Sequence, residues 1–544
     1  MTTPDGEVGF EKKQDVTAVT RGANETTAYA PIDAENPTEA PDLMAPVSRR
    51  LRSGALWSGL NSVLMRIASV ALMIAAARIV APEQFGVFAL AITVHTFLGS
   101  LADFGVSSAI ARKDLNPDEV APTATSISIA ASLVLGFAML IFAADIAQSL
   151  GSEDAAGPLR VLSIGVVLIG PFAVPAAQLQ RNYRQNRVFL ANAISFVPSS
   201  IVLVVFAVAG EGAMGFAWSR VVGQLIAGLL MVRGLDRFYR PGFSRSEVGP
   251  LLQFGVPLAV ANLLSQLLFN VDYLFVGRLI GTVEVGLYAL AFNIASWPSA
   301  LMGSILNGVV IPAFSSVRSD SLRMRAGIIR GMQIVTLIAF PMGAICAALA
   351  SSVVLTLYGE KWSLAGPVLS VLATYGVVFV VCLLLANVLV AVARTVLLLV
   401  VQVIALLALM PALVLGIDVG NLVGAGWAHI IVALLITLPI YLISVSRATG
   451  LRLLALPRAV ALQSVGAIAA FWVARFVAHF VGSPHLQLLL GGSMGSLVYS
   501  IMTVPLWVVY LPSLLRRRPV IARTIALSGT LRQWTTGGDT RERR

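Results

Sequence analysis

Charged side chains are scarce in this sequence. Only 12% of its 544 residues are Asp, Glu, Lys or Arg, whereas 57% are hydrophobic, and the mean hydropathy is +0.85. A typical soluble domain is about 25% charged, and no soluble core holds this much apolar sequence. The composition therefore excludes a soluble globular protein and is typical of a polytopic membrane protein.

Cysteine is nearly absent, and so are the motifs of common enzyme sites. Cys346 and Cys382 lie within apolar runs, so a disulfide framework or a metal site has nothing to support it. The sequence has no phosphate-binding GxxxxGK(S/T) loop, no zinc-ligand spacing and no Ser-His-Asp arrangement. A membrane enzyme needs an acid-base pair in a sizeable loop, and the outer connectors here are short. We expect no catalytic residue, no metal and no cofactor, and no enzymatic activity.

Apolar runs of membrane-spanning length follow one another almost without interruption. A helix needs about 20 apolar residues to cross a bilayer, and the pattern predicts an all-α protein with about fourteen spans. The predicted spans are Ala55–Ala77, Phe85–Ala109, Val120–Ala147, Leu159–Leu179, Val188–Ala209, Ala213–Val232, Leu251–Ile280, Val285–Pro312, Ile328–Ala350, Ala365–Val392, Val396–Leu415, Leu422–Ser444, Pro457–Val481 and Leu486–Leu511.

Basic residues gather in alternate connectors between these spans. The net charge of +11 therefore reflects membrane orientation and does not indicate nucleic-acid binding. Connectors around Arg184, Arg237 and Arg447 are predicted to be cytoplasmic, and those around Glu153 and Asp418 to lie outside. With an even number of spans, both termini are expected in the cytoplasm.

An internal repeat gives the expected architecture. RIVAPEQFGVFALA at residues 78–91 aligns without a gap to RLIGTVEVGLYALA at residues 278–291. Two lobes with the same orientation, related by a pseudo-two-fold axis along the membrane normal, would produce this pattern. The predicted domains are a disordered cytoplasmic tail without a signal peptide (1–50), an N-lobe (51–245), a C-lobe (246–452), two added spans (453–512) and a basic cytoplasmic tail (513–544).

One predicted helix carries a polar stripe. Asn262, Gln266 and Asn270 recur every four residues in the seventh span and share one face, which continues to Tyr273. Asp272 follows on the same helix, and a charge at membrane depth costs about 2.5–3.5 kcal/mol unless it meets water, a partner or a ligand. We expect this helix, with spans one, two and eight, to line a central cavity, although polar side chains of this kind also join helices in bilayers.

Buried charges are the other candidate site residues. Arg66 falls near the middle of the first span, and Arg220 lies at moderate depth in the sixth. A guanidinium group suits phosphate oxygens, so both are predicted to bind a diphosphate; an ion pair between Arg66 and Asp272 is the alternative. Asp103 and Asp272 are predicted to be proton or cation sites with a coupling role, or to form ion pairs. His95 and His429 are isolated and are expected to be packed.

Several stretches resemble a known family. FGVPLAVANLLSQLLFNVDYLFVGRLIGTVEVGLYALAF, VVIPAFSSV and LYGEKWSLAGPVLSVL are similar to the polysaccharide transporter family of the multidrug/oligosaccharidyl-lipid/polysaccharide exporter superfamily. In the first half, ADFGVSSAIARKD and PAAQLQRNYRQNRVFLANAIS add to the resemblance. It extends from about Ser53 to Leu511, and the long N-terminal tail departs from the family pattern.

The resemblance implies a flippase for undecaprenyl-diphosphate-linked oligosaccharides in the bacterial inner membrane, serving exopolysaccharide or O-antigen assembly by alternating access. The partners implied are the lipid-linked substrate, membrane lipids and polysaccharide polymerase or export machinery, with no nucleic acid. A drug/cation antiporter of the same superfamily and a membrane-embedded glycan ligase or polymerase remain as alternatives. A monomer is expected, since each lobe supplies half of the pathway.

Overall fold

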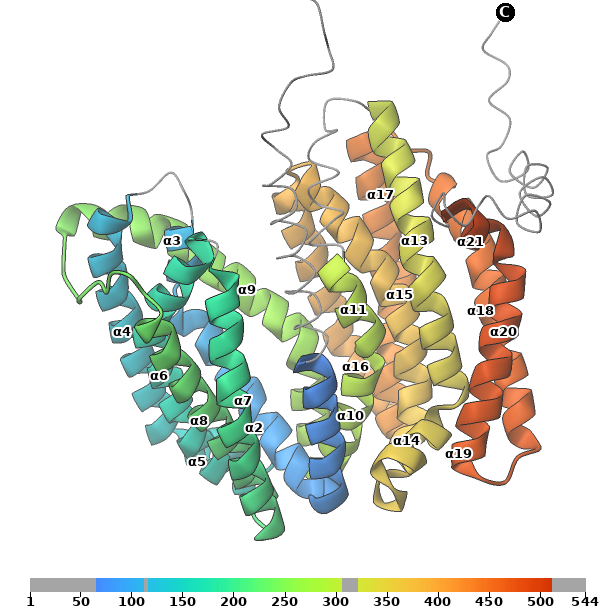
Figure 1. Cartoon of the computed structure of the whole chain (residues 1–544), viewed down its shortest axis with the longest axis horizontal. Coiled ribbons are helices and arrows are strands. Elements are labelled where there is room, and N and C mark those ends of the chain that lie inside the picture. Colours follow the sequence, from blue (N-terminus) through green and yellow to red (C-terminus); the bar gives the residue numbers. More distant parts are fainter. Residues whose placement is uncertain (1–64, 112–115, 183, 306–320, 511–544) are drawn as a thin grey trace, which may run out of the picture. The chain divides into compact units, whose positions relative to one another are not determined.

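The computed structural model describes residues 65–111, 116–182, 184–305 and 321–510, and every regular element in these ranges is a helix (Figure 1). The predicted all-α class is confirmed. The predicted tails and the VVIPAFSSV motif lie outside the described residues. The boundaries predicted for the lobes stay a prediction.

The helices of the first half pack mainly on their sequence neighbours. α4 packs on α6, α6 on α8, and α8 on α7. Asn116 starts α4, because its side chain accepts a hydrogen bond from the Asp118 amide and Pro117 occupies the first turn. The elements are a helix over residues 65–79, α2 (Pro82–Ala102), α3 (Val106–Ala111), α4 (Pro117–Ile141), α5 (Ala143–Ser149), η1 (Glu153–Ala155), α6 (Ala156–Arg181), α7 (Gln185–Val208) and α8 (Gly212–Arg233).

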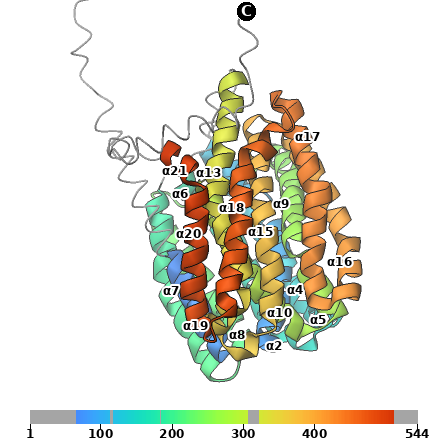
Figure 2. The ribbon, with the colours of Figure 1, turned by 90° about the vertical axis from the view of Figure 1, so that its right-hand side faces the viewer.

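The second half is built around α15, which contacts α10, α13 and α16. Its elements are α9 (Arg245–Leu279), α10 (Thr282–Ala295), α11 (Trp297–Ile305), α13 (Ser321–Ala348), α14 (Ala350–Tyr358), η3 (Glu360–Trp362), α15 (Ala365–Ala391), α16 (Thr395–Val432), the π-helix η4 (Ala433–Thr437) and α17 (Leu438–Thr449). The chain ends with α18 (Ala455–His479), α19 (Pro484–Leu486), the π-helix η5 (Gln487–Gly491), α20 (Gly492–Met502) and α21 (Val504–Tyr510). α18 packs on α13, with α20 beside it (Figure 2).

The predicted spans that lie wholly within the described residues agree with the helices except where helices break, whereas the first, eighth and last extend beyond those residues. Ten described helices are long and apolar enough to cross a membrane, or eleven if the bent pair α10 and α11 is one span. One of the ten, residues 395–449, contains two predicted spans. Gly420 and Asn421 leave the helical conformation there, and a Cβ at Gly424 would lie 1.8 Å from the Gly416 carbonyl oxygen, so the two arms form a hairpin.

The second predicted span, Phe85–Ala109, is not one continuous helix. α2 ends at Ala102, and Phe104 and Gly105 adopt positive φ angles of 47° and 66° before α3 begins. The break packs on α9, since a Cβ on Gly255 would lie 2.2 Å from the Phe104 carbonyl oxygen. Backbone contact this close requires glycine.

The surface of the bundle is apolar where a membrane would surround it. On α7, exposed apolar residues recur about every three or four positions and form a stripe. A helix face in contact with lipid is apolar because polar groups there would lack hydrogen-bond partners. This stripe consists of Leu190, Ile194, Val197, Ile201, Val204, Val205 and Val208.

The two repeat segments meet at a reciprocal contact between α2 and α10. A Cβ on Gly86 would lie 1.8 Å from the carbonyl oxygen of Thr282, and a Cβ on Gly286 would lie 1.9 Å from that of Pro82. The alignment of residues 78–91 with 278–291 pairs Gly86 with Gly286 and Pro82 with Thr282. The two glycines therefore make the same contact in exchange, as a two-fold axis between the segments requires.

Polar groups join the two halves near the end of the first helix. The Arg78 guanidinium donates to the carbonyls of Thr356 and Leu357 at the end of α14, at 2.7 and 2.9 Å. In return, the Lys361 ammonium donates to the carbonyls of Arg78 and Val80 at 2.9 and 2.8 Å. The last backbone carbonyls of a helix have no hydrogen-bond partner within that helix. Each half of the chain thus donates hydrogen bonds to such carbonyls in the other half.

Candidate substrate path and coupling site

The polar stripe lies on α9, with the burial expected of a helix that is only partly covered. Asn262 is exposed, and Gln266 and Asn270 are half-buried. The side-chain amide nitrogen of Asn270 donates a hydrogen bond to the backbone carbonyl oxygen of Gln266 at 2.9 Å. The side-chain carbonyl oxygen of Asn270 therefore stays available to a ligand. Pro250 and Pro257 lie inside α9, and each removes one backbone hydrogen bond from the helix.

The two predicted diphosphate ligands lie on separate helices. Arg66 is exposed on the helix over residues 65–79, and within the described residues it has no ion pair. Arg220 is exposed on α8, where its charge acts on His95. His95 itself is packed, since its Nδ1 lies 3.1 Å from the Leu162 carbonyl oxygen. The roles of the two arginines stay predictions.

Asp103 lies in the break after α2. It is half-buried, and its Oδ1 accepts a hydrogen bond from the Ser107 hydroxyl at 2.5 Å. The carboxylate thus closes the turn between α2 and α3. Its coupling role stays a prediction, and turn closure accounts for this contact without it.

Asp272 is fully buried, and its partner is His429 of α16. The Nε2 of His429, which is 4% exposed, lies 3.4 Å from Asp272 Oδ2. The other oxygen, Oδ1, accepts a hydrogen bond from the Tyr273 amide at 3.1 Å. Among the described residues, neither Oδ2 nor Nε2 has a hydrogen bond of good geometry, so the contact between them is a close approach without a hydrogen bond.

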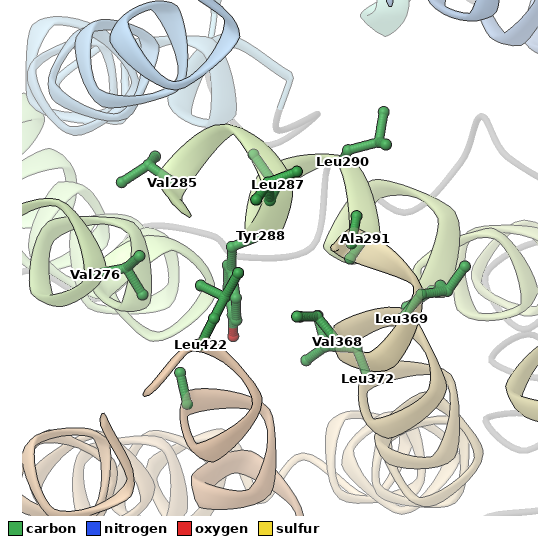
Figure 3. Close-up of a cluster of buried hydrophobic side chains, with 14 of the residues drawn as sticks. Val276, Val285, Leu287, Tyr288, Leu290, Ala291, Val368, Leu369, Leu372 and Leu422 are labelled. Carbon is green, nitrogen blue, oxygen red and sulfur yellow. The ribbon is translucent and has the colours of Figure 1, made fainter. Parts of the chain in front are cut away.

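Aromatic rings from three helices surround this pair. We call Tyr273, Tyr288, Phe292 and Tyr375 the aromatic shell. The ring centroid of Tyr375 lies 5.0 Å from that of His429, and the Phe292 centroid lies at 6.1 Å. Beyond the shell lies a buried apolar cluster from α9, α10, α15 and α16, of which Tyr288 is a member (Figure 3). The pair is therefore enclosed by aromatic rings, three of them tyrosines, and by apolar side chains.

The connector between α8 and α9 forms ion pairs with other segments of the chain. Arg184 pairs with Asp236 through a 2.7 Å hydrogen bond, and Arg237 donates to Asp118 at 2.9 Å. The hydrogen bond from Arg184 lowers the pKa of Asp236, and burial, followed by the bond to Asp118, raises the pKa of Tyr239. These contacts tie the connector to the start of α4 and of α7.

An apolar cavity of about 510 Å³ lies among α13, α15, η4, α17 and α18. Phe340, Val377, Leu434, Phe471 and Trp472 are among its lining residues. The π-helix η4 contributes Leu434, and π-turns of this kind are frequent at functional sites.

Solved structures show what this arrangement of helices is. Lipid II flippase MurJ, in an inward closed conformation, matches with a TM-score of 0.68 at 14% identity, covering 83% of this chain and 99% of MurJ. An inward-facing multidrug resistance MATE family transporter of the MOP superfamily matches with a TM-score of 0.56 at 18% identity, covering 70% of this chain and 95% of that one. The chain therefore shares the helical fold of these two membrane proteins.

Sequence comparison gives the family. The family model described as polysaccharide biosynthesis protein matches residues 75–367, more than half of the chain. The lipopolysaccharide biosynthesis protein WzxC of Escherichia coli K12 is 26% identical over 401 residues, 73% of this chain and 81% of WzxC. The succinoglycan biosynthesis transport protein ExoT of Rhizobium meliloti 1021 is 29% identical over 439 residues, 78% of this chain and 87% of ExoT. The chain belongs to the polysaccharide biosynthesis protein family, which confirms the resemblance to a polysaccharide transporter family stated above.

His429 is the neighbour of Asp272 that the sequence did not point to. It lies far along the chain from Asp272, and no spacing relates the two residues. The available signal was the rarity of ionisable residues in apolar spans, which applied to Asp272 and His429 alike.

Proposed function

We propose that this protein is a flippase that moves undecaprenyl-diphosphate-linked oligosaccharides across the bacterial inner membrane, for exopolysaccharide or O-antigen assembly. Membership of the polysaccharide biosynthesis family carries the proposal. Its relative ExoT, a succinoglycan transport protein, and the similar fold of MurJ, a lipid II flippase, support the proposal. No step requires a catalytic residue or cofactor, and we assign the chain no enzymatic activity.

The residues divide among the parts of such a substrate. Arg66 and Arg220 bind the diphosphate, because guanidinium groups donate paired hydrogen bonds to phosphate oxygens. Asn262, Gln266 and Asn270 contact sugar hydroxyls through their amides. Asp103 and Asp272 take part in coupling or in ion pairs. The exposure of Arg66, Arg220 and Asn262 supports these roles, since a ligand must reach them.

The prenyl chain has a candidate site of its own. The apolar cavity among α13, α15, η4, α17 and α18 offers about 510 Å³ lined mainly by aliphatic and aromatic side chains. A polyprenyl tail placed there would stay in an apolar environment while the diphosphate and sugars cross. α18, the first of the added spans, supplies one wall.

The proposed orientation in the membrane follows from the charge pattern. Both termini lie in the cytoplasm, since the basic connectors face that side. The protein works as a monomer with membrane lipids around it, and polysaccharide polymerase or export machinery acts on the product.

The proposal is tested by deleting the gene and labelling lipid-linked oligosaccharide from the outer face of the membrane. Accumulation on the cytoplasmic face with loss of exported polymer, restored by the wild-type gene, is expected. Normal distribution between the leaflets would contradict the proposal.

Two other functions give different results in the same strain. A multidrug antiporter, which the MATE likeness in fold and the buried Asp272 favour, predicts hypersensitivity to cationic dyes with normal polysaccharide. A glycan ligase or polymerase predicts short repeat units that have already reached the outer face. Each outcome excludes the flippase.

A further inference from the structure

We propose that a pocket formed by the end of α6, the start of α7 and the connector between α8 and α9 binds a phosphate group, and that an anionic phospholipid of the membrane supplies it. The pocket has a volume of about 90 Å³, which suits a small anion or a few water molecules. We call it the connector pocket, and the residues that line it include Gln178, Arg181, Arg184, Asp236, Arg237 and Tyr239. Binding at this pocket does not depend on the identity of the transported substrate.

Guanidinium groups dominate the lining of the connector pocket, which contains three arginines and one carboxylate, that of Asp236. Arg237 donates to Asp118 at 2.9 Å, and its guanidinium carbon lies 5.4 Å from the centre of the Tyr239 ring. Among the described residues this is the one hydrogen bond of the Arg237 side chain, so most of its N–H groups remain for a ligand. Guanidinium groups donate paired hydrogen bonds to phosphate oxygens, which makes an oxyanion the expected ligand.

Gln178 gives the connector pocket an unpaired hydrogen-bond donor. It lines the pocket and is 6% exposed, and its amide nitrogen Nε2 has no hydrogen-bond partner among the described residues. A buried donor without a partner destabilises the folded protein, so an acceptor bound beside it would be favourable. The arginines of the pocket can only donate, whereas a phosphate oxygen accepts.

The second half of the chain repeats the turn after α6 with an apolar residue in place of Gln178. The backbone N–H of Arg184 donates to the carbonyl five residues earlier at 2.8 Å, and that of Arg394, between α15 and α16, does the same at 2.8 Å. The φ and ψ angles agree as well, at −90° and 44° for Arg184 and −100° and 49° for Arg394. The buried Val388 lies six residues before Arg394, as Gln178 lies six residues before Arg184. The turn itself therefore requires no glutamine.

The connector pocket lies where a lipid-facing surface begins. The exposed apolar stripe on α7 starts at Leu190, and Arg187 precedes it by three residues on the same face of the helix. Arg187 also donates to the carbonyl of Gly234 in the connector. A phospholipid with its acyl chains along the stripe would place its head group beside the pocket. Basic pockets at the cytoplasmic side of a membrane bind anionic head groups, and this connector is predicted to be cytoplasmic.

The sequence around the pocket also attracts anionic lipid from a distance. Residues 181–187 and 233–245 together contain seven arginines and one acidic residue. The positive-inside rule accounts for this excess of charge, but it requires neither a cavity nor a buried amide nitrogen without a partner. These two features distinguish a binding site from a connector that is merely basic.

A phosphate group in the pocket would link three segments of the chain. The connector, residues 234–244, joins the two halves and is already tied to α4, since the Gly242 N–H donates to the Pro122 carbonyl at 3.1 Å. A head group that binds Arg184 and Arg237 together would add a link from the connector to the adjoining ends of α6 and α7. Anionic lipid should therefore slow the local opening of the connector.

The test measures hydrogen exchange in the purified full-length protein in detergent. Peptides covering residues 176–190 and 232–246 are followed with dioctanoyl phosphatidylglycerol, dioctanoyl phosphatidylcholine or inorganic phosphate, each at about ten times the apparent Kd for phosphatidylglycerol. At this concentration a ligand that binds only the closed form slows exchange about ten-fold. Phosphatidylglycerol is expected to do so, whereas the zwitterionic lipid and inorganic phosphate should have little effect.

Two variants separate the pocket from general charge attraction. Arg184→Gln removes a charge-assisted donor and should weaken phosphatidylglycerol binding about thirty-fold, and Gln178→Leu removes a neutral donor and should weaken it about ten-fold. Because Gln178→Leu also removes an unpaired polar group, its thermal midpoint without lipid should equal or exceed that of wild type. Arg394→Gln removes an exposed arginine from the equivalent turn of the second half and is the matched control, which should bind the lipid as wild type does.

Three results would overturn the proposal. Equal protection by phosphatidylcholine, or equal loss of binding in Arg184→Gln and Arg394→Gln with none in Gln178→Leu, would show non-specific attraction in place of a site. Equal protection by inorganic phosphate would overturn the lipid assignment and identify soluble phosphate as the ligand. None of these results bears on the flippase proposal, which fails through a normal leaflet distribution in the deletion strain.

Discussion

Single charged residues show how far the sequence leads and where it stops. Asp272 stands out in the sequence because carboxylates are costly at membrane depth. Its partner His429 does not, since the contact depends on how α9 and α16 pack, and side-chain packing between distant segments has no local signature. The sequence offered Arg66 as an ion-pair partner, whereas the structure places the imidazole of His429 beside Asp272.

Arg66 gives the first test at this scale. Replacing it by Ala removes a charge-assisted hydrogen-bond donor, worth about 2 kcal/mol, so apparent substrate affinity and export should fall about thirty-fold. Export is measured relative to the amount of protein in the membrane. Arg160→Ala, which removes an exposed arginine at the start of α6, is the control. Wild-type export in the Arg66 variant would show that this guanidinium does not bind the diphosphate.

Among the helices, length and apolar composition are enough to predict the spans, because the bilayer sets the same requirement for each one. The breaks inside the helices cannot be predicted from length and composition. The turn at Asp103–Gly105 forms where the chain packs against Gly255, and a partner on another helix is not visible in the residues of α2. Gly105 was the only local indication, since it adopts a positive φ angle.

The α2–α10 crossing should tolerate no side chain. Gly86→Ala places a methyl group 1.8 Å from a backbone oxygen, so the helices must separate, at a cost of about 1–3 kcal/mol. The thermal unfolding midpoint in detergent should fall by several degrees. Gly249→Ala on α9 adds a methyl group with no neighbour within 4 Å and should leave the midpoint unchanged or raise it. Equal midpoints for the two variants would contradict tight backbone packing at Gly86.

The contact between the first helix and α14 can be weakened in two ways. Arg78→Gln and Lys361→Gln each remove hydrogen bonds to helix-end carbonyls, worth about 1 kcal/mol per bond. Both variants should increase hydrogen exchange in peptides covering residues 66–80 and 350–364. Arg160→Gln is the control, because it also removes one positive charge. Unchanged hydrogen exchange in both Arg78→Gln and Lys361→Gln would show that these hydrogen bonds do not hold the two segments together.

For the whole molecule, the fold class and family were predictable because composition, repeat and motif order are properties of the entire chain. Membrane orientation is a further prediction at this scale. In a Cys346→Ala/Cys382→Ala background, a cysteine at Glu153 should react with a membrane-impermeant maleimide added outside intact cells. A cysteine at Arg240 should react only after the membrane is permeabilised. Both side chains are exposed, so accessibility depends on the side of the membrane alone. The reverse pattern would invert the proposed topology.

The reciprocal contact of Gly86 and Gly286 also bears on the origin of the chain. An exchange of identical contacts across an axis is isologous, the form of interface made by two copies of one polypeptide in a homodimer. Duplication and fusion of a gene encoding one such subunit would carry this contact into a single chain without altering it. On this account the crossing of α2 and α10 descends from a subunit interface and now lies within one chain.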